Sequence, residues 1–99
     1  MIRVDRRGPR DFDVEVAEET AGGADGRVFT YQVRVDDGVL GALGLDPDDE
    51  AAMAALVRES FAYLLAREPA SSILRTFELS VISRYFPGYP NDIRSRLAG

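Results

Sequence analysis

Two segments in the first third of the chain alternate between apolar and polar residues, which is the pattern of a strand with one buried face. Residues 12–16 carry acidic side chains between their apolar ones, and residues 29–35 carry Thr, Gln and Arg in the corresponding places. The loop between them contains Gly-Gly and Asp-Gly pairs, which are turn signals. The two segments are therefore predicted to form an antiparallel hairpin, with Asp13 and Glu15 across from Arg34.

The N-terminal segment, residues 1–10, is basic, because it carries four arginines and a single acidic residue. Ile2 and Val4 alternate with charged residues, so this segment is predicted to be either a short additional strand or a flexible extension. Pro9 marks the break before the hairpin, since proline cannot donate a hydrogen bond to a strand ladder.

A short helical turn is expected directly after the hairpin. Asp36 or Asp37 can serve as its N-cap, and Gly44 can close it in the left-handed conformation that glycine tolerates best. The apolar residues of this turn are Val39, Leu40 and Leu43.

A long amphipathic helix is predicted between the prolines at positions 47 and 69. Asp46 is a suitable N-cap, Pro47 fits the first helical position, and the acidic residues 48–50 complement the positive end of the helix dipole. Pro69 ends the helix. At about 20 residues and about 30 Å, the helix is expected to support the apolar face of the hairpin. The residues that follow the spacing of one helical face are Met53, Leu56, Val57, Ser60, Phe61, Leu64 and Leu65.

Short helical pieces are expected in the C-terminal third. Ser71 or Ser72 can cap a turn that extends to Phe77, and Ser80 can cap a second turn. Asn91 can cap a last short helix. The many large apolar side chains of this region either wrap the long helix or form a contact surface.

The predicted fold class is α+β: an antiparallel β-hairpin packed on one long amphipathic helix, with short C-terminal helices. No repeat or linker divides the chain, so residues 1–99 are expected to form a single domain in which the basic segment 1–10 is the candidate flexible part. A two-stranded sheet has open edges that either the helices cover or a second copy pairs with, so a homodimer is one expectation.

The composition removes most classes of enzyme. The chain has no cysteine and no histidine, and therefore no thiolate nucleophile, no general base that titrates near neutral pH and no soft metal ligand. No catalytic residue, cofactor or metal site is predicted. The enzyme hypothesis that remains is a pair of carboxylates in a buried pocket, for example Glu59 with Glu68 or Asp92.

Other absences bear on location and partners. No apolar run approaches the about 20 residues of a membrane helix, and the first residues lack the apolar stretch of a signal peptide. Without cysteine there is no disulfide framework, so a cytoplasmic protein with no membrane partner is expected. The formal net charge of −5 disfavours nucleic acid as a partner. The acidic segment 46–50 does not predict a calcium loop, because Ala51 and Val57 stand where such a loop needs glycine and a carboxylate.

Part of the chain resembles the ribbon-helix-helix repressors: a strand at residues 29–35 is followed by a short helical turn and then by an amphipathic helix. In that family two chains pair their strands, so the resemblance implies a dimeric DNA-binding repressor in which Thr30, Gln32 and Arg34 read base edges. The strand at 12–17 offers a partner within the chain, and the acidic residues at 36–50 would lie near DNA. Both features count against this alternative.

The C-terminal block resembles a small bacterial family of uncharacterised proteins. The residues that carry the resemblance follow the pattern FxxLLxREPxxSILxxFxLxVIxRYFPxY, from Phe61 to Tyr89. The resemblance extends over residues 12–97, and members of the family also begin with a two-stranded segment. It supports the limits of the domain and implies no activity.

The residue set most open to a functional role consists of Phe77, Arg84, Tyr85, Phe86 and Tyr89. Aromatic residues either close a core or, together with arginine, anchor a protein interface, and the sequence leaves both open. The first functional hypothesis is a non-catalytic protein-interaction or regulatory module. It would bind another protein or a second copy of itself, through this surface or through a strand edge.

Overall fold

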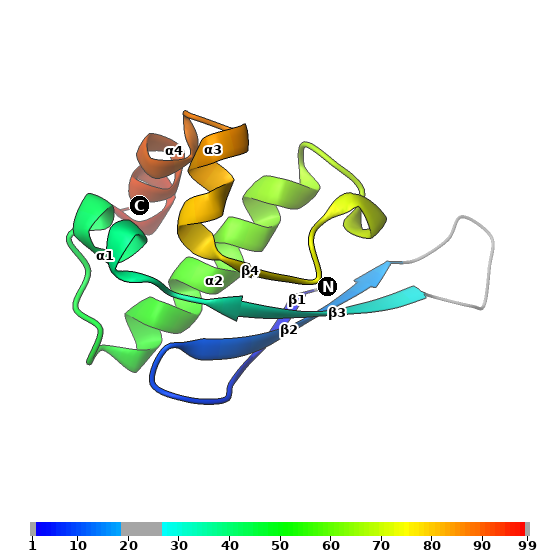
Figure 1. Ribbon diagram of the computed structural model, residues 1–99, viewed down its shortest axis with the longest axis horizontal. Coiled ribbons are helices and arrows are strands. Elements are labelled where there is room, and N and C mark those ends of the chain that lie inside the picture. Colours follow the sequence, from blue (N-terminus) through cyan, green and yellow to red (C-terminus); the bar gives the residue numbers. More distant parts are fainter. Residues whose placement is uncertain (1, 19–26, 99) are drawn as a thin grey trace.

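The structure is a computed structural model that describes residues 2–18 and 27–98 (Figure 1). Its sheet has four strands in the spatial order β1-β2-β3-β4. The strands are β1 (Ile2–Arg6), β2 (Asp11–Glu18), β3 (Arg27–Arg34) and β4 (Thr76–Glu78). The helices are α1 (Asp37–Leu43), α2 (Glu50–Leu65), α3 (Ile82–Tyr85) and α4 (Tyr89–Ala98), with the 3₁₀ turns η1 (Ala70–Ser72) and η2 (Leu79–Val81). The α+β class is as predicted, and the sheet is larger than a hairpin.

β2 and β3 form the predicted antiparallel hairpin. Its glycine-containing loop, predicted as a turn, lies outside the described residues. The predicted pairing of Asp13 and Glu15 with Arg34 is wrong. Arg34 lies across from Asp11, with 4.0 Å between the guanidinium nitrogen and the carboxylate oxygen, and Asp13 lies across from Gln32. A register shift of two residues leaves the same faces buried, so the apolar pattern alone cannot distinguish the two registers.

Two further strands complete the sheet. β1 pairs antiparallel with β2, so the N-terminal segment takes the first of its two expected forms, a short strand. β4 pairs parallel with β3, and the Gln32 N–H donates to the carbonyl oxygen of Arg75 at 2.8 Å. The predicted helical turn from Ser71 or Ser72 to Phe77 is therefore wrong beyond η1. The segment is extended there because it bonds to the edge of β3.

The long helix is confirmed, with tighter bounds than predicted. α2 has 16 residues and is therefore about 24 Å long. Its N-cap is Asp49, whose carboxylate accepts a hydrogen bond from the Ala52 N–H at 3.0 Å, and not Asp46. The Asp46 carboxylate accepts from the Asp48 N–H at 2.9 Å, which places Pro47 in a turn before the helix. Two aspartates three residues apart both suit a cap, and local sequence does not rank them.

α1 is the predicted short helix, closed by Gly44 at φ 67°. Asp36 stands at its N-cap, but the carboxylate does not bond to the helix. It accepts a hydrogen bond from the Ser80 N–H in η2 at 3.0 Å. A Cβ on Gly38 would lie 2.9 Å from the Asp36 carboxylate, so a larger residue there would displace that carboxylate. Asp36 thus joins two segments that are distant in sequence. The prediction that Ser80 caps a turn is wrong, because Ser80 lies inside η2.

η2, α3 and α4 are the short helical pieces expected near the C-terminus. α4 begins at Tyr89 and not at an Asn91 cap, and the Asn91 side chain accepts from the Arg94 guanidinium at 3.1 Å inside the helix. α2 ends at Leu65, ahead of Pro69. In Figure 1, α1, α3 and α4 lie together at one side of the molecule, and α4 packs against α2.

α2 and the inner face of the sheet enclose one hydrophobic core. The predicted face of α2 is buried except for Leu65, which is half-buried, and Tyr63 is buried in addition. The Phe61 ring lies 5.0 Å from the ring of Tyr31, whose hydroxyl donates to the carbonyl oxygen of Ala70 at 2.6 Å. Within residues 2–18 and 27–98, no helix is long and apolar enough to cross a membrane.

Candidate interaction groove

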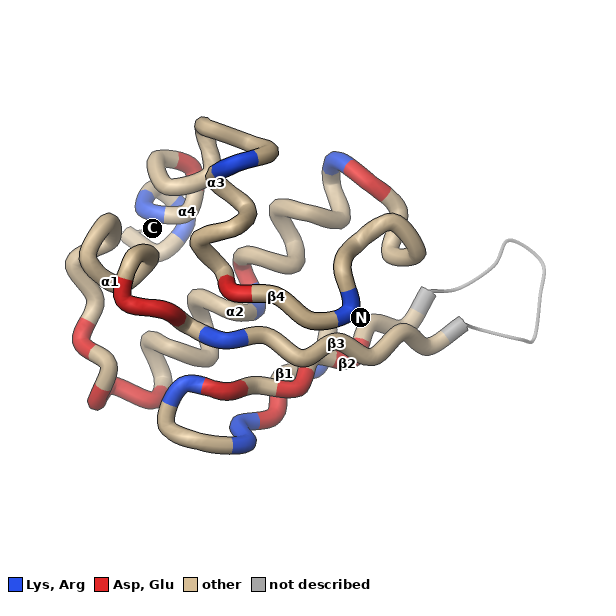
Figure 2. The backbone as a smooth tube through the Cα atoms, viewed as in Figure 1, with Lys and Arg blue, Asp and Glu red and all other residues tan. Residues whose placement is uncertain are grey.

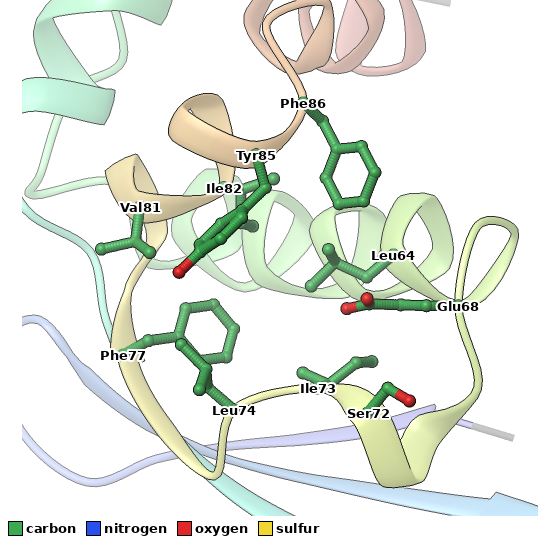
Figure 3. A pocket seen from close by; sticks show the side chains of 10 residues that line it. All are labelled: Leu64, Glu68, Ser72, Ile73, Leu74, Phe77, Val81, Ile82, Tyr85 and Phe86. Atoms are coloured by element: carbon green, nitrogen blue, oxygen red, sulfur yellow. The ribbon is translucent and has the colours of Figure 1, made fainter.

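An apolar groove lies between the C-terminal end of α2, η1, β4 and α3 (Figure 3). It has a volume of about 240 Å³. All its lining side chains are hydrophobic except those of Glu68 and Ser72. The lining residues are Leu64, Glu68, Ser72, Ile73, Leu74, Phe77, Val81, Ile82, Tyr85 and Phe86.

The floor of the groove is part of the hydrophobic core. Leu64, Ile73 and Ile82 are buried, with exposed fractions of 4%, 4% and 3%. Phe77 is held by β4, and its ring lies 6.0 Å from the ring of Phe61 on α2. Because the core packs these side chains from behind, the floor is formed before anything binds.

Leu74 and Tyr85 form the rim of the groove. Their exposed fractions are 52% and 69%. In Figure 3 the Tyr85 ring reaches from α3 past Val81 of η2 toward Phe77 on β4. Large apolar side chains are normally exposed singly, so two of them beside an apolar hollow mark a candidate contact surface.

Glu68 contributes a negative charge to the groove. Its side chain is half-buried and points into the hollow (Figure 3). The neighbouring Arg67 is engaged elsewhere: its guanidinium lies 3.5 Å from the centre of the Tyr63 ring and donates to the Tyr63 carbonyl oxygen at 3.1 Å. No ion pair joins Glu68 to any residue in the described part of the chain.

The structure divides the cluster that the sequence indicated. Phe77, Tyr85 and Phe86 line the groove, and Arg84 is exposed on α3 beside it. Tyr89 is fully buried and therefore cannot belong to a contact surface. Tyr89 therefore belongs to the core, and Phe77, Tyr85 and Phe86 stay candidates for a contact surface.

Tyr89 joins α4 to α2 inside the core. Ser60 uses its only proton on the carbonyl oxygen of Leu56, at 2.7 Å, so the Tyr89 hydroxyl is the donor in its 2.6 Å bond to the Ser60 Oγ. The Tyr63 ring lies 5.4 Å from the Tyr89 ring. Burial raises the pKa of Tyr89 above the ordinary tyrosine value.

Sequence reasoning missed several residues of the groove. Leu64 was assigned to the core face of the long helix, which is correct, but its outer side also forms part of the groove floor. For Ile73 and Leu74 the sequence predicts a helical turn, and so short a turn does not indicate which of the two side chains is exposed. Glu68 stands out only as a carboxylate directly before Pro69, and nothing in that pair of residues indicates that it faces a hollow.

The residues of the DNA-binding alternative lie on the open face of the sheet. Thr30, Gln32 and Arg34 are exposed, as the strand alternation predicts. Acidic residues surround them (Figure 2): Asp13 lies across from Gln32, and Asp11 across from Arg34. β3 bonds to β2 on one edge and to β4 on the other, so this part of β3 cannot pair with a second β3 as in a ribbon-helix-helix dimer.

The carboxylates of the enzyme hypothesis are partly brought together. Glu59 and Asp92 both contact Arg96, at 3.6 and 2.9 Å. Glu68 lies apart from them, in the groove. Among the residues that the structure describes, no three acidic side chains are grouped so that they could hold a metal ion.

Comparisons of the chain with protein-family models, with curated proteins and with solved structures find no match. The resemblance of the C-terminal block to a small bacterial family therefore stays a prediction. Function has to be inferred from the groove itself.

Proposed function

We propose that the protein is a non-catalytic interaction module whose groove receives an apolar side chain of a partner protein, next to a positively charged residue of that partner. The observation that supports this is the combination of an apolar floor, an exposed apolar rim at Leu74 and Tyr85, and the carboxylate of Glu68, which forms no ion pair with the residues that the structure describes.

The size of the groove favours a side chain over a small-molecule ligand. Sites for small molecules typically enclose about 300–1,000 Å³ and cover most of the ligand. A groove of about 240 Å³ that is open along its rim suits one or two aliphatic or aromatic side chains. Single anchor residues in such hollows commonly supply most of the binding energy of a protein interface.

The chemistry of the rim specifies the partner further. Burying Leu74 and Tyr85 against an apolar anchor removes apolar surface from water, which favours association. Glu68 would lose hydration in the same step, and this costs free energy unless a cation of the partner replaces the water. The expected partner segment therefore carries an arginine or lysine close to its apolar anchor.

The test is site-specific cross-linking followed by titration. A photoreactive amino acid at Tyr85 should cross-link to one defined segment that contains an apolar residue near an arginine or lysine. The matched control places the same amino acid at Thr30 on the open face of the sheet, and no cross-link to that segment is expected there.

A synthetic peptide with the cross-linked sequence should then bind the protein in a calorimetric or NMR titration. Tyr85→Ala and Glu68→Gln should each weaken binding by about tenfold, which corresponds to about 1.4 kcal/mol. Tyr85→Phe keeps the ring and should change binding little. A cross-linked segment without a basic residue, or equal binding by all the variants, would contradict the proposal.

A further inference from the structure

β1 is one of the two edge strands of the sheet, and its contact with β2 shows which of its backbone groups point outward. The Arg7 N–H donates to the carbonyl oxygen of Asp11 at 2.7 Å where the β1–β2 connection begins. Hydrogen-bonded pairs alternate along an antiparallel ladder, so Arg3 and Asp5 are the β1 residues that bond to β2. The N–H and C=O groups of Ile2, Val4 and Arg6 therefore point away from β2. No strand pairs with this edge within residues 2–18 and 27–98.

The side chains of this edge are self-complementary in charge. Arg3 and Asp5 share the open face of the sheet, because strand residues two apart point the same way. If a second copy of β1 pairs antiparallel about Val4, Arg3 lies across from Asp5 of the second copy, and the symmetry repeats this contact. Both pairs occupy sites without backbone hydrogen bonds between the copies, where facing side chains approach most closely.

Neighbouring registers are disfavoured by the same side chains. If the pairing is centred on Arg3, the Arg3 side chains of the two copies face each other. If it is centred on Asp5, the two Asp5 side chains do, so like charges meet in either case. A shift by one residue moves the apolar side chains to the wrong face. Charged residues on an edge strand normally prevent association. Here their alternation in sign permits one register and opposes the others.

The inner face of β1 supports the same pairing. Ile2 and Val4 are only partly buried, although both pack against the core. In the register centred on Val4, the two Val4 side chains face each other and Ile2 faces Arg6 of the second copy. Arg6 is already oriented by its ion pair with Glu50 of α2, so its methylene groups can cover Ile2 while its charge stays satisfied.

We propose that two copies of this chain associate through β1, antiparallel and centred on Val4, so that their two sheets become continuous. The occupant of the edge is a second copy because the charge sequence of β1 is complementary to itself. β1 and β4 are opposite edges of the sheet, so the groove beside β4 stays free in such a dimer. A failure of this proposal therefore leaves the proposed function of the groove standing, and the reverse also holds.

The first experiment is sedimentation equilibrium of the full chain over a wide concentration range, which should show a reversible monomer–dimer equilibrium. Arg3→Asp and Asp5→Arg each turn the two attractive contacts between the copies into repulsive ones, and each also breaks the 3.4 Å ion pair between Arg3 and Asp5 of one chain. Each should weaken the dimer by about tenfold or more. An equimolar mixture of these two variants restores opposite charges across the interface and should associate like the natural chain. Arg34→Asp makes the same charge change on an inner strand of the same face, and should leave the dimer unchanged.

The second experiment removes an outward hydrogen-bond donor. Val4→Pro deletes the N–H that points away from β2, so the dimer should be lost while the β1–β2 bonds remain possible. Circular dichroism reports whether this variant is folded. If it is not, the equimolar mixture of Arg3→Asp and Asp5→Arg decides whether the dimer forms through β1. A chain that stays monomeric at every concentration overturns the proposal. So does a dimer that is unaffected by the charge reversals, or a mixture of the two variants that fails to associate.

Discussion

At the scale of single residues, Tyr89 shows how environment decides the role of a side chain. The sequence places it among other aromatic residues near the C-terminus, where a contact surface is one expectation. In the structure it shares the inner face of α4 with Ile93, four residues later, and both are fully buried. Its hydroxyl keeps a partner there because Ser60 lies on the facing turn of α2.

The buried hydroxyl of Tyr89 predicts a loss of stability at alkaline pH. Below about pH 10 this tyrosine is protonated in both the folded and the unfolded chain. Above that pH the unfolded chain ionises first, because burial raises the pKa of Tyr89 only in the folded state. The free energy of unfolding should therefore decrease by up to about 1.4 kcal/mol per pH unit from this residue. The chain has no cysteine and no lysine, so few other groups titrate in that range.

Urea unfolding of the natural chain and of Tyr89→Phe at about pH 8 and about pH 11 measures this effect. At the lower pH the free energy of unfolding of Tyr89→Phe should be about 1 kcal/mol below that of the natural chain, because the variant lacks the hydrogen bond to Ser60. Its free energy of unfolding should also depend less on pH. Tyr85→Phe is the matched control, since it removes an exposed hydroxyl. An equal dependence on pH in both variants would contradict the role assigned to Tyr89.

At the scale of elements, the start of α2 is decided by hydrogen bonds between residues three apart or fewer. Asp49→Ala removes the carboxylate that accepts from the Ala52 N–H, and should lower the free energy of unfolding by about 1 kcal/mol. Asp46→Ala removes a carboxylate that bonds within the preceding turn and should have a smaller effect. Chemical denaturation of the two variants compares them directly. A larger loss from Asp46→Ala would mean that the helix begins earlier, as the sequence suggests.

β4 is the element that local sequence describes least well. Only three residues form it, and Phe77 is the member that faces the core. So short a segment carries no period that distinguishes a strand from a helical turn. Its conformation is decided by the edge of β3, whose backbone groups it satisfies. Because β4 also supplies one wall of the groove, the candidate site could not be assembled from the sequence.

At the scale of the whole molecule, α2 and the sheet share one core. The loss of a large side chain from the centre of this core should therefore destabilise every element. Phe61 lies between Tyr31 and Phe77, with ring distances of 5.0 and 6.0 Å. Phe61→Ala should cost about 3–5 kcal/mol, a large part of the 5–15 kcal/mol that stabilises a typical domain.

Thermal unfolding followed by circular dichroism and by tyrosine fluorescence checks this prediction. Both signals should shift together to lower temperature in Phe61→Ala, because the domain unfolds as one unit. Leu74→Ala, at the exposed rim of the groove, is the control and should change stability by less than about 0.5 kcal/mol. Separate transitions for the two signals would show that the core is not shared.

The sequence by itself determined the α+β class, the β2–β3 hairpin, the inward residues of both strands and the amphipathic face of α2. These features depend on periodic spacing and on chemistry between residues close in the chain, which the sequence displays directly. Only the tertiary structure decided the strand register, the position of β4, the partner of Asp36, the burial of Tyr89 and the place of Glu68 in the groove. Each of these depends on which distant segment satisfies a backbone group or covers a side chain, and that choice is made by the packing of the whole chain.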